Sequence, residues 1–261
     1  MKKLMQLIFL VSSFYATACS CDPPSITEKY VQSDFVANVT IVKIYPNEKN
    51  KELYRADIKI NKLYKGDQLK SIYVAGNNGG IGSSCSIFIP AKTKLIAYAR
   101  KNADGKYTIG MCSGLLYIDY SGSYRKKTRK NARQMKNQRR ELTILELFKK
   151  KNIQYTSKIQ FREKAVLHKK LAQFKGLSLK KSYAFFELTF TEHLAVKDVK
   201  LIAGFDDPID NQLIDILKEG SWSSFSNGVK DKVPENSTLL FGIYYYEAEN
   251  EYASFLSRFY H

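Results

Sequence analysis

The sequence predicts a mainly β N-terminal barrel with a flanking helix, followed by a small α+β domain. Two observations carry this prediction. Five β-rich segments separated by turn residues lie within about 100 residues, which is typical of a small closed or half-closed barrel. After a strongly basic stretch, the pattern changes to strand, strand, helix and strand, which is typical of a small α+β layer.

Turn residues bound each predicted strand of the barrel. The strands are expected at residues 34–44, 54–63, 72–75, 94–100 and 107–111. Pro46-Asn47-Glu48 is expected to end the first strand, and Gly66-Asp67 marks the turn after the second. The last two strands form a predicted hairpin around residues 102–105. The glycine-rich run 76–82 is predicted to be a flexible loop next to Cys85.

A basic segment separates the barrel from the second unit. Residues 124–151 contain twelve Lys or Arg side chains against only Glu141 and Glu146. Leu142, Leu145 and Phe148 recur at three-residue spacing, which predicts a helix over 139–148 that closes the barrel after a basic linker. Besides a solvated surface, a block of like charge also suggests a segment that binds a membrane surface or a partner.

The second unit has its own alternation of elements. We expect a helix at 159–174, strands at 183–190 and 196–205, an amphipathic helix at 210–218 and a final strand at 238–246. Trp222 is expected to anchor the core of this unit.

Residues 1–18 have the organisation of a secretory signal. Lys2 and Lys3 precede an apolar run over 4–11, and small residues follow at 16–18. The apolar run is too short to span a bilayer as a helix. Cleavage after Ala18 would leave a free α-amino group on Cys19. We therefore predict a secreted or extracytoplasmic protein.

Four segments are predicted in all. They are a signal peptide at 1–18, a barrel domain at 19–122, a basic helical linker at 123–156 and a small α+β domain at 157–261.

The four cysteines all lie in the first half of the chain, at Cys19, Cys21, Cys85 and Cys112. An even number in an exported chain favours two disulfides over a metal site. A bond between Cys19 and Cys21 would close a ring with one residue inside, which backbone geometry disfavours. Two pairings remain, and both tie the N-terminus to the segments around residues 85 and 112.

The composition argues against several functions. The formal net charge of +17 fits nucleic acid, an anionic surface or acidic partners, but export argues against nucleic acid. The three histidines form no HExxH motif, no G-x-S-x-G elbow is present, and the glycine run lacks the Lys-Ser/Thr of a phosphate loop. With the cysteines in disulfides, no catalytic constellation is visible. We expect no enzyme and no cofactor.

Several motifs in register resemble the tissue inhibitors of metalloproteinases. The mature chain would open with Cys19-Ser20-Cys21-Asp22-Pro23, like the Cys-x-Cys-x-Pro of that family. Further matches follow in order up to about residue 118: Ser33-Asp34-Phe35-Val36, Lys62-Leu63-Tyr64-Lys65-Gly66, Ser84-Cys85, Leu95-Ile96-Ala97, Asp104-Gly105 and Met111-Cys112-Ser113. The resemblance implies a netrin-like, OB-type barrel with disulfides Cys19–Cys85 and Cys21–Cys112.

The resemblance also implies a partner, a zinc metalloendopeptidase. In that family, the α-amino group and the carbonyl oxygen of the first cysteine chelate the catalytic zinc of the bound protease. Carried over, these atoms belong to Cys19, which would be a zinc ligand in trans. An amine and a carbonyl can fill the position that a catalytic zinc keeps open for water. Ser20 would enter the main specificity pocket of the protease, and Cys21, Ser84 and Cys85 would lie around it.

The chain departs from the family in three ways. A further cysteine of the family is replaced by Val31, and its cysteine-rich C-terminal domain is missing. Residues 157–261 instead weakly resemble the C-terminal domain of TonB-like proteins, through Val199-Lys200-Leu201, the helix at 210–218 and Trp222.

An alternative function starts from the same N-terminus. Residues 16–19 also fit a permissive lipoprotein signal. Lipidation of Cys19 would block its amine, leave an odd cysteine and anchor the chain to a membrane. The alternative is thus a non-inhibitory netrin-like binding module or a lipoprotein of the cell envelope.

Overall fold

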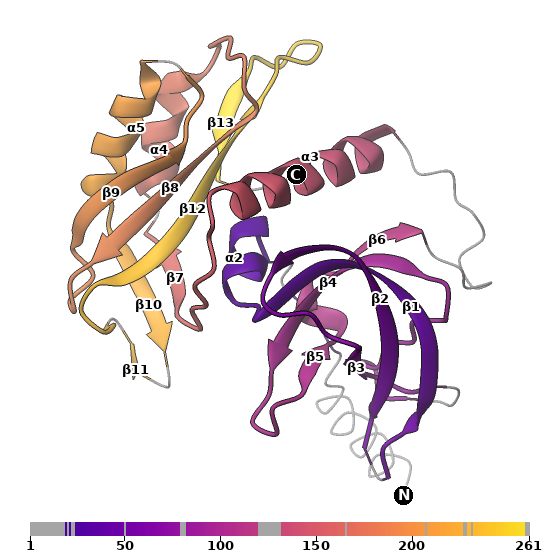
Figure 1. Ribbon diagram of the computed structural model, residues 1–261. Helices are drawn as coiled ribbons and strands as arrows, with labels where there is room; N and C mark the ends of the chain where they lie inside the picture. Colours follow the sequence, from indigo (N-terminus) through magenta and orange to yellow (C-terminus); the bar gives the residue numbers. More distant parts are fainter. Residues whose placement is uncertain are drawn as a thin grey trace, which may run out of the picture.

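A computed structural model gives the arrangement of the chain. It describes residues 19, 21, 24–49, 51–78, 82–119, 132–164, 166–206, 208–226, 229–230 and 232–258. The predicted signal peptide and the first part of the basic linker therefore lie outside the described residues. The chain forms two β-rich regions, and the helices α2 (Ile26–Val31) and α3 (Ala132–Lys150) lie between them (Figure 1). No helix in the described part of the chain is long and apolar enough to cross a membrane.

The N-terminal region is a closed five-stranded barrel with a sixth strand attached. The strand order is β1-β2-β3-β5-β4, and β1 also pairs with β4, which closes the barrel; β6 pairs with β4. The strands are β1 (Phe35–Asn47), β2 (Leu53–Lys65), β3 (Ser71–Ala75), β4 (Lys94–Lys101), β5 (Tyr107–Ile109) and β6 (Leu116–Asp119). The predicted barrel and the predicted β4–β5 hairpin are confirmed.

Alternating apolar side chains fill this barrel. Val39, Ile41 and Ala56 are fully buried members of its core cluster. The first strand ends within Pro46-Asn47-Glu48, as expected, although β1 continues beyond the expected bound of residue 44 to Asn47. The β1–β2 register shifts between Ile44 and Asn47, and such an irregularity accommodates a proline that cannot donate to the ladder.

Two helices cover one side of the barrel. α2 (Ile26–Val31), which was not predicted from the sequence, begins with a capping box in which Ser25 and Glu28 satisfy each other's backbone N–H groups. α3 (Ala132–Lys150) contains the predicted helix 139–148 and begins several residues earlier. Its Leu145 and Phe148 are fully buried, as their spacing predicted.

The C-terminal region has two sheets, with order β11-β10-β7 and β13-β12-β8-β9, and helices α4 and α5 lie on one side of the larger sheet (Figure 1). The elements are β7 (Gln160–Glu163), α4 (Val166–Leu171), η3 (Ala172–Phe174), β8 (Tyr183–Phe190), β9 (Val196–Ala203), α5 (Ile209–Lys218), β10 (Trp222–Ser226), β11 (Val229–Lys230), β12 (Ser237–Tyr246) and β13 (Phe255–Ser257). The predicted helix at 159–174 was wrong in its first part, because β7 pairs with β10 there. Trp222 is buried in the core, as expected.

A shared hydrophobic cluster joins the two regions. Phe148 of α3 lies between Tyr30 of α2 and Phe185 of β8, with ring centroids 4.9 Å from each. The same cluster includes Val36 from the barrel and Tyr244 from β12. The barrel and the larger C-terminal sheet therefore bury apolar surface against the same two helices.

A buried lysine side chain adds hydrogen bonds across this junction. The Nζ atom of Lys65, at the end of β2, donates to the carbonyl oxygens of Tyr30 (3.1 Å), Val31 (3.3 Å) and Tyr155 (2.7 Å). Burial lowers the pKa of Lys65 to about 8. One side chain thus connects the barrel, the end of α2 and the segment that leads into the C-terminal region.

Candidate functional site

The four cysteines form two neighbouring disulfides. Cys19 is bonded to Cys85 and Cys21 to Cys112, each with a Cα–Cα distance of 5.3 Å, so the pairing implied by the resemblance is confirmed. The Sγ atoms of Cys19, Cys21 and Cys112 all lie within 4.8 Å of one another. The bonds close loops with sequence separations of 66 and 91 residues. In the chain-entropy model, loops of such length correspond to about 4 kcal/mol of stabilisation for each bond.

The loop that carries Cys85 connects β3 to β4 and folds back on the end of β3. The Ile87 N–H donates to the carbonyl of Ala75 (3.3 Å), and the Gly76 N–H donates to the carbonyl of Glu52 (2.9 Å). A Cβ atom on Gly76 would lie only 1.9 Å from the carbonyl oxygen of Ile87. Glycine is therefore required where the loop returns past the strand.

A single carboxylate holds the turn at Ser83–Ser86. Glu52, in the β1–β2 turn, accepts from the Ser83 N–H (2.7 Å) and the Ser83 hydroxyl (2.6 Å), and also from the Ser86 hydroxyl. Hydrogen bonds from the side chains of Ser83 and Ser86, and then from the Ser83 backbone, lower the pKa of Glu52 below its ordinary value. The carboxylate is exposed, so its order comes from these donors and not from burial.

The other disulfide is held from the side of α2. Cys112 lies in a short 3₁₀ helix, η2 (Met111–Ser113), which ends at Gly114 in the left-handed conformation with φ of 69°. A Cβ atom there would lie 2.9 Å from Cδ of Lys29, so glycine fits both the backbone and the packing. The Lys29 Nζ atom donates to the Gly114 carbonyl (3.1 Å) and pairs with Glu141 of α3 (2.6 Å).

These contacts fix both ends of the N-terminal stretch. Cys19 and Cys21 are half-buried and joined to the barrel, and Pro24 lies beside Gly114 just before the Ser25 cap of α2. The described residues Cys19, Cys21 and Pro24 are therefore held against the barrel. Holding residues in place before binding lowers the entropy that is lost when a partner binds.

The comparison with known families agrees with this geometry. Residues 17–120 match the family model for the tissue inhibitor of metalloproteinase. The resemblance predicted from the motifs is thereby confirmed over the barrel and its two disulfides. The match spans less than half of the chain, and the C-terminal region lies beyond it. No curated protein matches the chain.

The predicted site residues of the region that matches this family model lie as follows. Cys19, Cys21 and Cys85 are brought together through the disulfides, and Ser84 is exposed beside Cys85. Ser20 lies outside the described residues.

Two exposed apolar side chains close in sequence to the cysteines were not predicted from the sequence. Phe88 is 44% exposed three positions after Cys85, and Met111 is 46% exposed just before Cys112. An apolar residue in such a segment is usually assigned to the core, and only the structure shows that both reach solvent. Both add exposed apolar surface to the segments that carry the disulfide cysteines.

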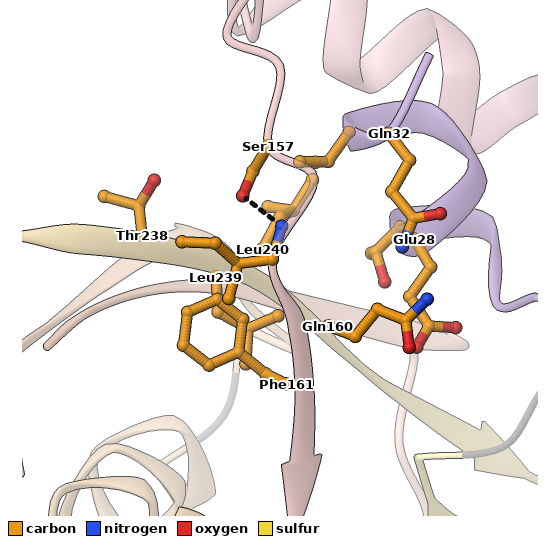
Figure 2. A pocket seen from close by; sticks show the side chains of 11 residues that line it. Glu28, Gln32, Ser157, Gln160, Phe161, Thr238, Leu239 and Leu240 are labelled. Carbon is orange, nitrogen blue, oxygen red and sulfur yellow. Dashed lines mark hydrogen bonds between the residues drawn. The ribbon is translucent and has the colours of Figure 1, made fainter. Parts of the chain in front are cut away.

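A pocket elsewhere in the molecule is separate from this site. It lies between α2, the segment leading into β7, and β12, with Glu28, Gln160 and Leu239 among its lining residues (Figure 2). Its wall contains no cysteine and no histidine. Its side chains belong to the junction between the barrel and the C-terminal region, so we assign it no part in the cysteine site.

Proposed function

We propose that this chain is an exported inhibitor of zinc metalloendopeptidases that acts through its mature N-terminus. Removal of residues 1–18 would free the α-amino group of Cys19. That amine and the Cys19 carbonyl oxygen would chelate the zinc of the partner protease. The match to the inhibitor family supports an inhibitor-like function in general, and the two adjacent disulfides that hold Cys19 and Cys21 support this location.

The proposed chemistry needs little from the rest of the chain. A catalytic zinc keeps one coordination position open for water, and a neutral amine with its adjacent carbonyl can occupy that position. Ser20 would follow into the main specificity pocket, and Cys21, Ser84 and Cys85 would contact the rim of the protease cleft. No bond is broken in this mode of binding, so we propose a non-enzymatic role.

The disulfide pattern also supports a free amine on Cys19. All four cysteines are paired, and a lipid on the Cys19 sulfur would remove the Cys19–Cys85 bond. Two disulfides are typical of proteins outside the cytosol, which fits an extracellular protein. A membrane contact would follow only from lipidation of Cys19, and no nucleic acid is part of the proposal.

The decisive experiment compares two forms of the chain with native disulfides. One begins at Cys19, and its matched control carries one additional alanine before Cys19. Against a panel of zinc metalloendopeptidases, the first should inhibit stoichiometrically. The control should be weaker by about 100-fold or more, because the chelating atoms are displaced. Equal inhibition by both forms would place the contact elsewhere, and no inhibition by either would favour the non-inhibitory binding module.

Intact mass of the protein from its native host tests the lipoprotein alternative. A chain that begins at unmodified Cys19 with two disulfides supports the inhibitor. A diacylglyceryl mass on Cys19 would overturn the chelation mechanism and leave a membrane-tethered barrel.

A further inference from the structure

We infer that Glu52 is a positioning residue of the proposed protease-binding edge. Its carboxylate would fix the Ser83–Ser86 turn, and through this turn the orientation of Cys85 and of the bonded Cys19. The inference rests on the proposed function, because the edge it positions is the one proposed to enter the protease cleft.

The hydrogen bonds converge on one side chain from both ends of the turn. Ser83 donates its N–H (2.7 Å) and its hydroxyl (2.6 Å), and Ser86 donates its hydroxyl. The turn itself is closed by the Ser86 N–H, which donates to the carbonyl of Ser83 (2.9 Å). Ser84 and Cys85 are the two central residues of this turn. An acceptor that binds the residues on either side of them therefore fixes the orientation of both.

The turn needs this external acceptor. Residues 82–93 form no strand or helix, so the chain around Cys85 has no regular ladder to order it. A Cβ atom on Gly82 would lie 2.3 Å from Oγ of Ser86, which shows how closely the turn is folded. Apart from the Cys19–Cys85 bond and the contact of Ile87 with Ala75, the described hold on the turn comes from Glu52.

The β1–β2 turn that carries Glu52 is itself tied to the start of the same loop. The Asn47 Nδ2 atom donates to the carbonyl of Gly76 (2.8 Å), and the Asn78 N–H donates to Oδ1 of Asn47 (2.9 Å). The Gly76 N–H returns a bond to the Glu52 carbonyl (2.9 Å). The β1–β2 turn is thus hydrogen-bonded both to the start of the Cys85 loop and to the Ser83–Ser86 turn within it.

A carboxylate suits this place better than an amide. Three donors point at Glu52, and a carboxylate offers only acceptors. The amide nitrogen of a glutamine is a donor, so one of the Ser83 or Ser86 donors would lose its partner. Hydrogen bonds to a charged group are also stronger than neutral ones. Glu52→Gln therefore keeps the size of the side chain and weakens its hold on the turn.

Inhibition of a metalloendopeptidase that the wild-type chain inhibits is the first readout. Glu52→Gln should raise the inhibition constant about tenfold, since loss of charge-assisted bonds adds an ordering cost on binding. The matched control is Glu48→Gln in the same turn, because Glu48 pairs with Lys106 and Lys51 and not with the Cys85 loop. The control should leave the inhibition constant unchanged.

The second readout needs no protease. Hydrogen exchange at the Ser83 amide and reduction of Cys19–Cys85 by a small thiol, mapped by alkylation and mass, should both become about tenfold faster in Glu52→Gln. Reduction of Cys21–Cys112 and the global unfolding midpoint should stay as in the wild type. If Glu52→Gln changed neither the exchange rate of the Ser83 amide nor the reduction rate of Cys19–Cys85, the inference would be overturned. It would also be overturned if both rates rose while the inhibition constant stayed unchanged.

The two proposals fail differently. A wild-type chain that inhibits no metalloendopeptidase overturns the proposed function, and with it the positioning role toward a protease, even if Glu52→Gln still loosens the turn. A wild-type chain that inhibits, with a variant that inhibits equally well, overturns only the role of Glu52.

Discussion

Gly76 is the residue at which the Cys85 loop passes closest to the barrel. A Cβ atom there would lie 1.9 Å from the carbonyl oxygen of Ile87, and backbone cannot yield as a flexible side chain does. We expect Gly76→Ala to destabilise the chain by about 1–3 kcal/mol, as overpacking does, measured by denaturant unfolding. The control is Gly110→Ala, whose Cβ would meet only the Ala75 methyl at 3.3 Å. Equal losses in both variants would contradict the close approach.

Acidification offers a second test at the scale of one residue. Hydrogen bonds lower the pKa of Glu52, so its hold on the turn is present above the ordinary value of 4.5 and is lost as pH falls through the lowered pKa. Ser83 amide protection in the wild type should therefore fall toward that of Glu52→Gln in acid. Hydrogen exchange of the two chains in parallel cancels the intrinsic pH dependence. A constant ratio down to the acid limit would contradict this expectation.

At the scale of secondary structure, local pattern predicted the longer strands and helices, and short elements such as α2 and β7 were missed. The bounds expected for β8, residues 183–190, are those observed, because its short run is rich in aromatic side chains, which is typical of a strand. The six-residue α2 is too short to show helical periodicity, although the Ser25-x-x-Glu28 capping box was visible. β7 was assigned to a helix because its pairing with β10 is non-local and leaves no trace in its own residues.

Only those residues of the site that belong to recognisable sequence motifs could be predicted. Cysteine spacing left two pairings, and the family resemblance selected the one observed. Glu52 could not be found in this way, because its partners Ser83 and Ser86 lie 31 and 34 positions away. An exposed acid in a turn has the same pattern in sequence as an ordinary solvated side chain.

α3 makes two ion pairs to the barrel region that differ mainly in burial. Lys29–Glu141 is 2.6 Å long with side chains 9% and 6% exposed, and Glu141 also accepts from the Tyr98 hydroxyl (2.6 Å). Lys62–Glu146 is 2.5 Å long with both side chains 45% exposed. Their similar lengths make them a matched pair for the effect of burial.

We expect the two glutamates to differ strongly on truncation. Glu141→Ala should cost about 3–5 kcal/mol in unfolding free energy, because it leaves the Lys29 charge buried without its partner. Glu146→Ala should cost no more than about 1 kcal/mol, as for other exposed pairs. Denaturant unfolding of both variants gives the comparison. If they were equally destabilised, the Lys29–Glu141 contact would not be the desolvated pair that the structure shows.

At the scale of the whole molecule, buried phenols surround the junction between the two regions. Burial raises the pKa of Tyr30, Tyr98 and Tyr155, and in Tyr98 the Glu141 carboxylate adds to the effect. Below about pH 10 these phenols are protonated in both the folded and unfolded chain, so they add no pH dependence. Above that value the unfolded chain releases protons first, and the free energy of unfolding falls as pH rises.

Spectroscopic titration of the phenols tests this expectation. Exposed tyrosines should ionise first. The buried tyrosines should ionise only when the chain loses its structure, and circular dichroism of the same samples measures that loss. Ionisation of all tyrosines in one step, with the fold intact, would contradict the raised pKa values of these three tyrosines.

Because one hydrophobic cluster is shared by the barrel and the larger C-terminal sheet, we expect the two regions to unfold together. Phe148 contacts Tyr30 and Phe185 from opposite regions, so Phe148→Ala should cost about 3–5 kcal/mol and affect both. Trp222, the single tryptophan, lies in a separate core of the C-terminal region and reports on that region alone by fluorescence. Hydrogen exchange of the β1 and β2 amides, with the disulfides intact, reports on the barrel. We expect both midpoints to coincide in the wild type and to fall together in Phe148→Ala, because neither region can bury its share of the cluster alone. Two separated midpoints, with only one moved by the substitution, would show that the cluster joins the regions without coupling their stability.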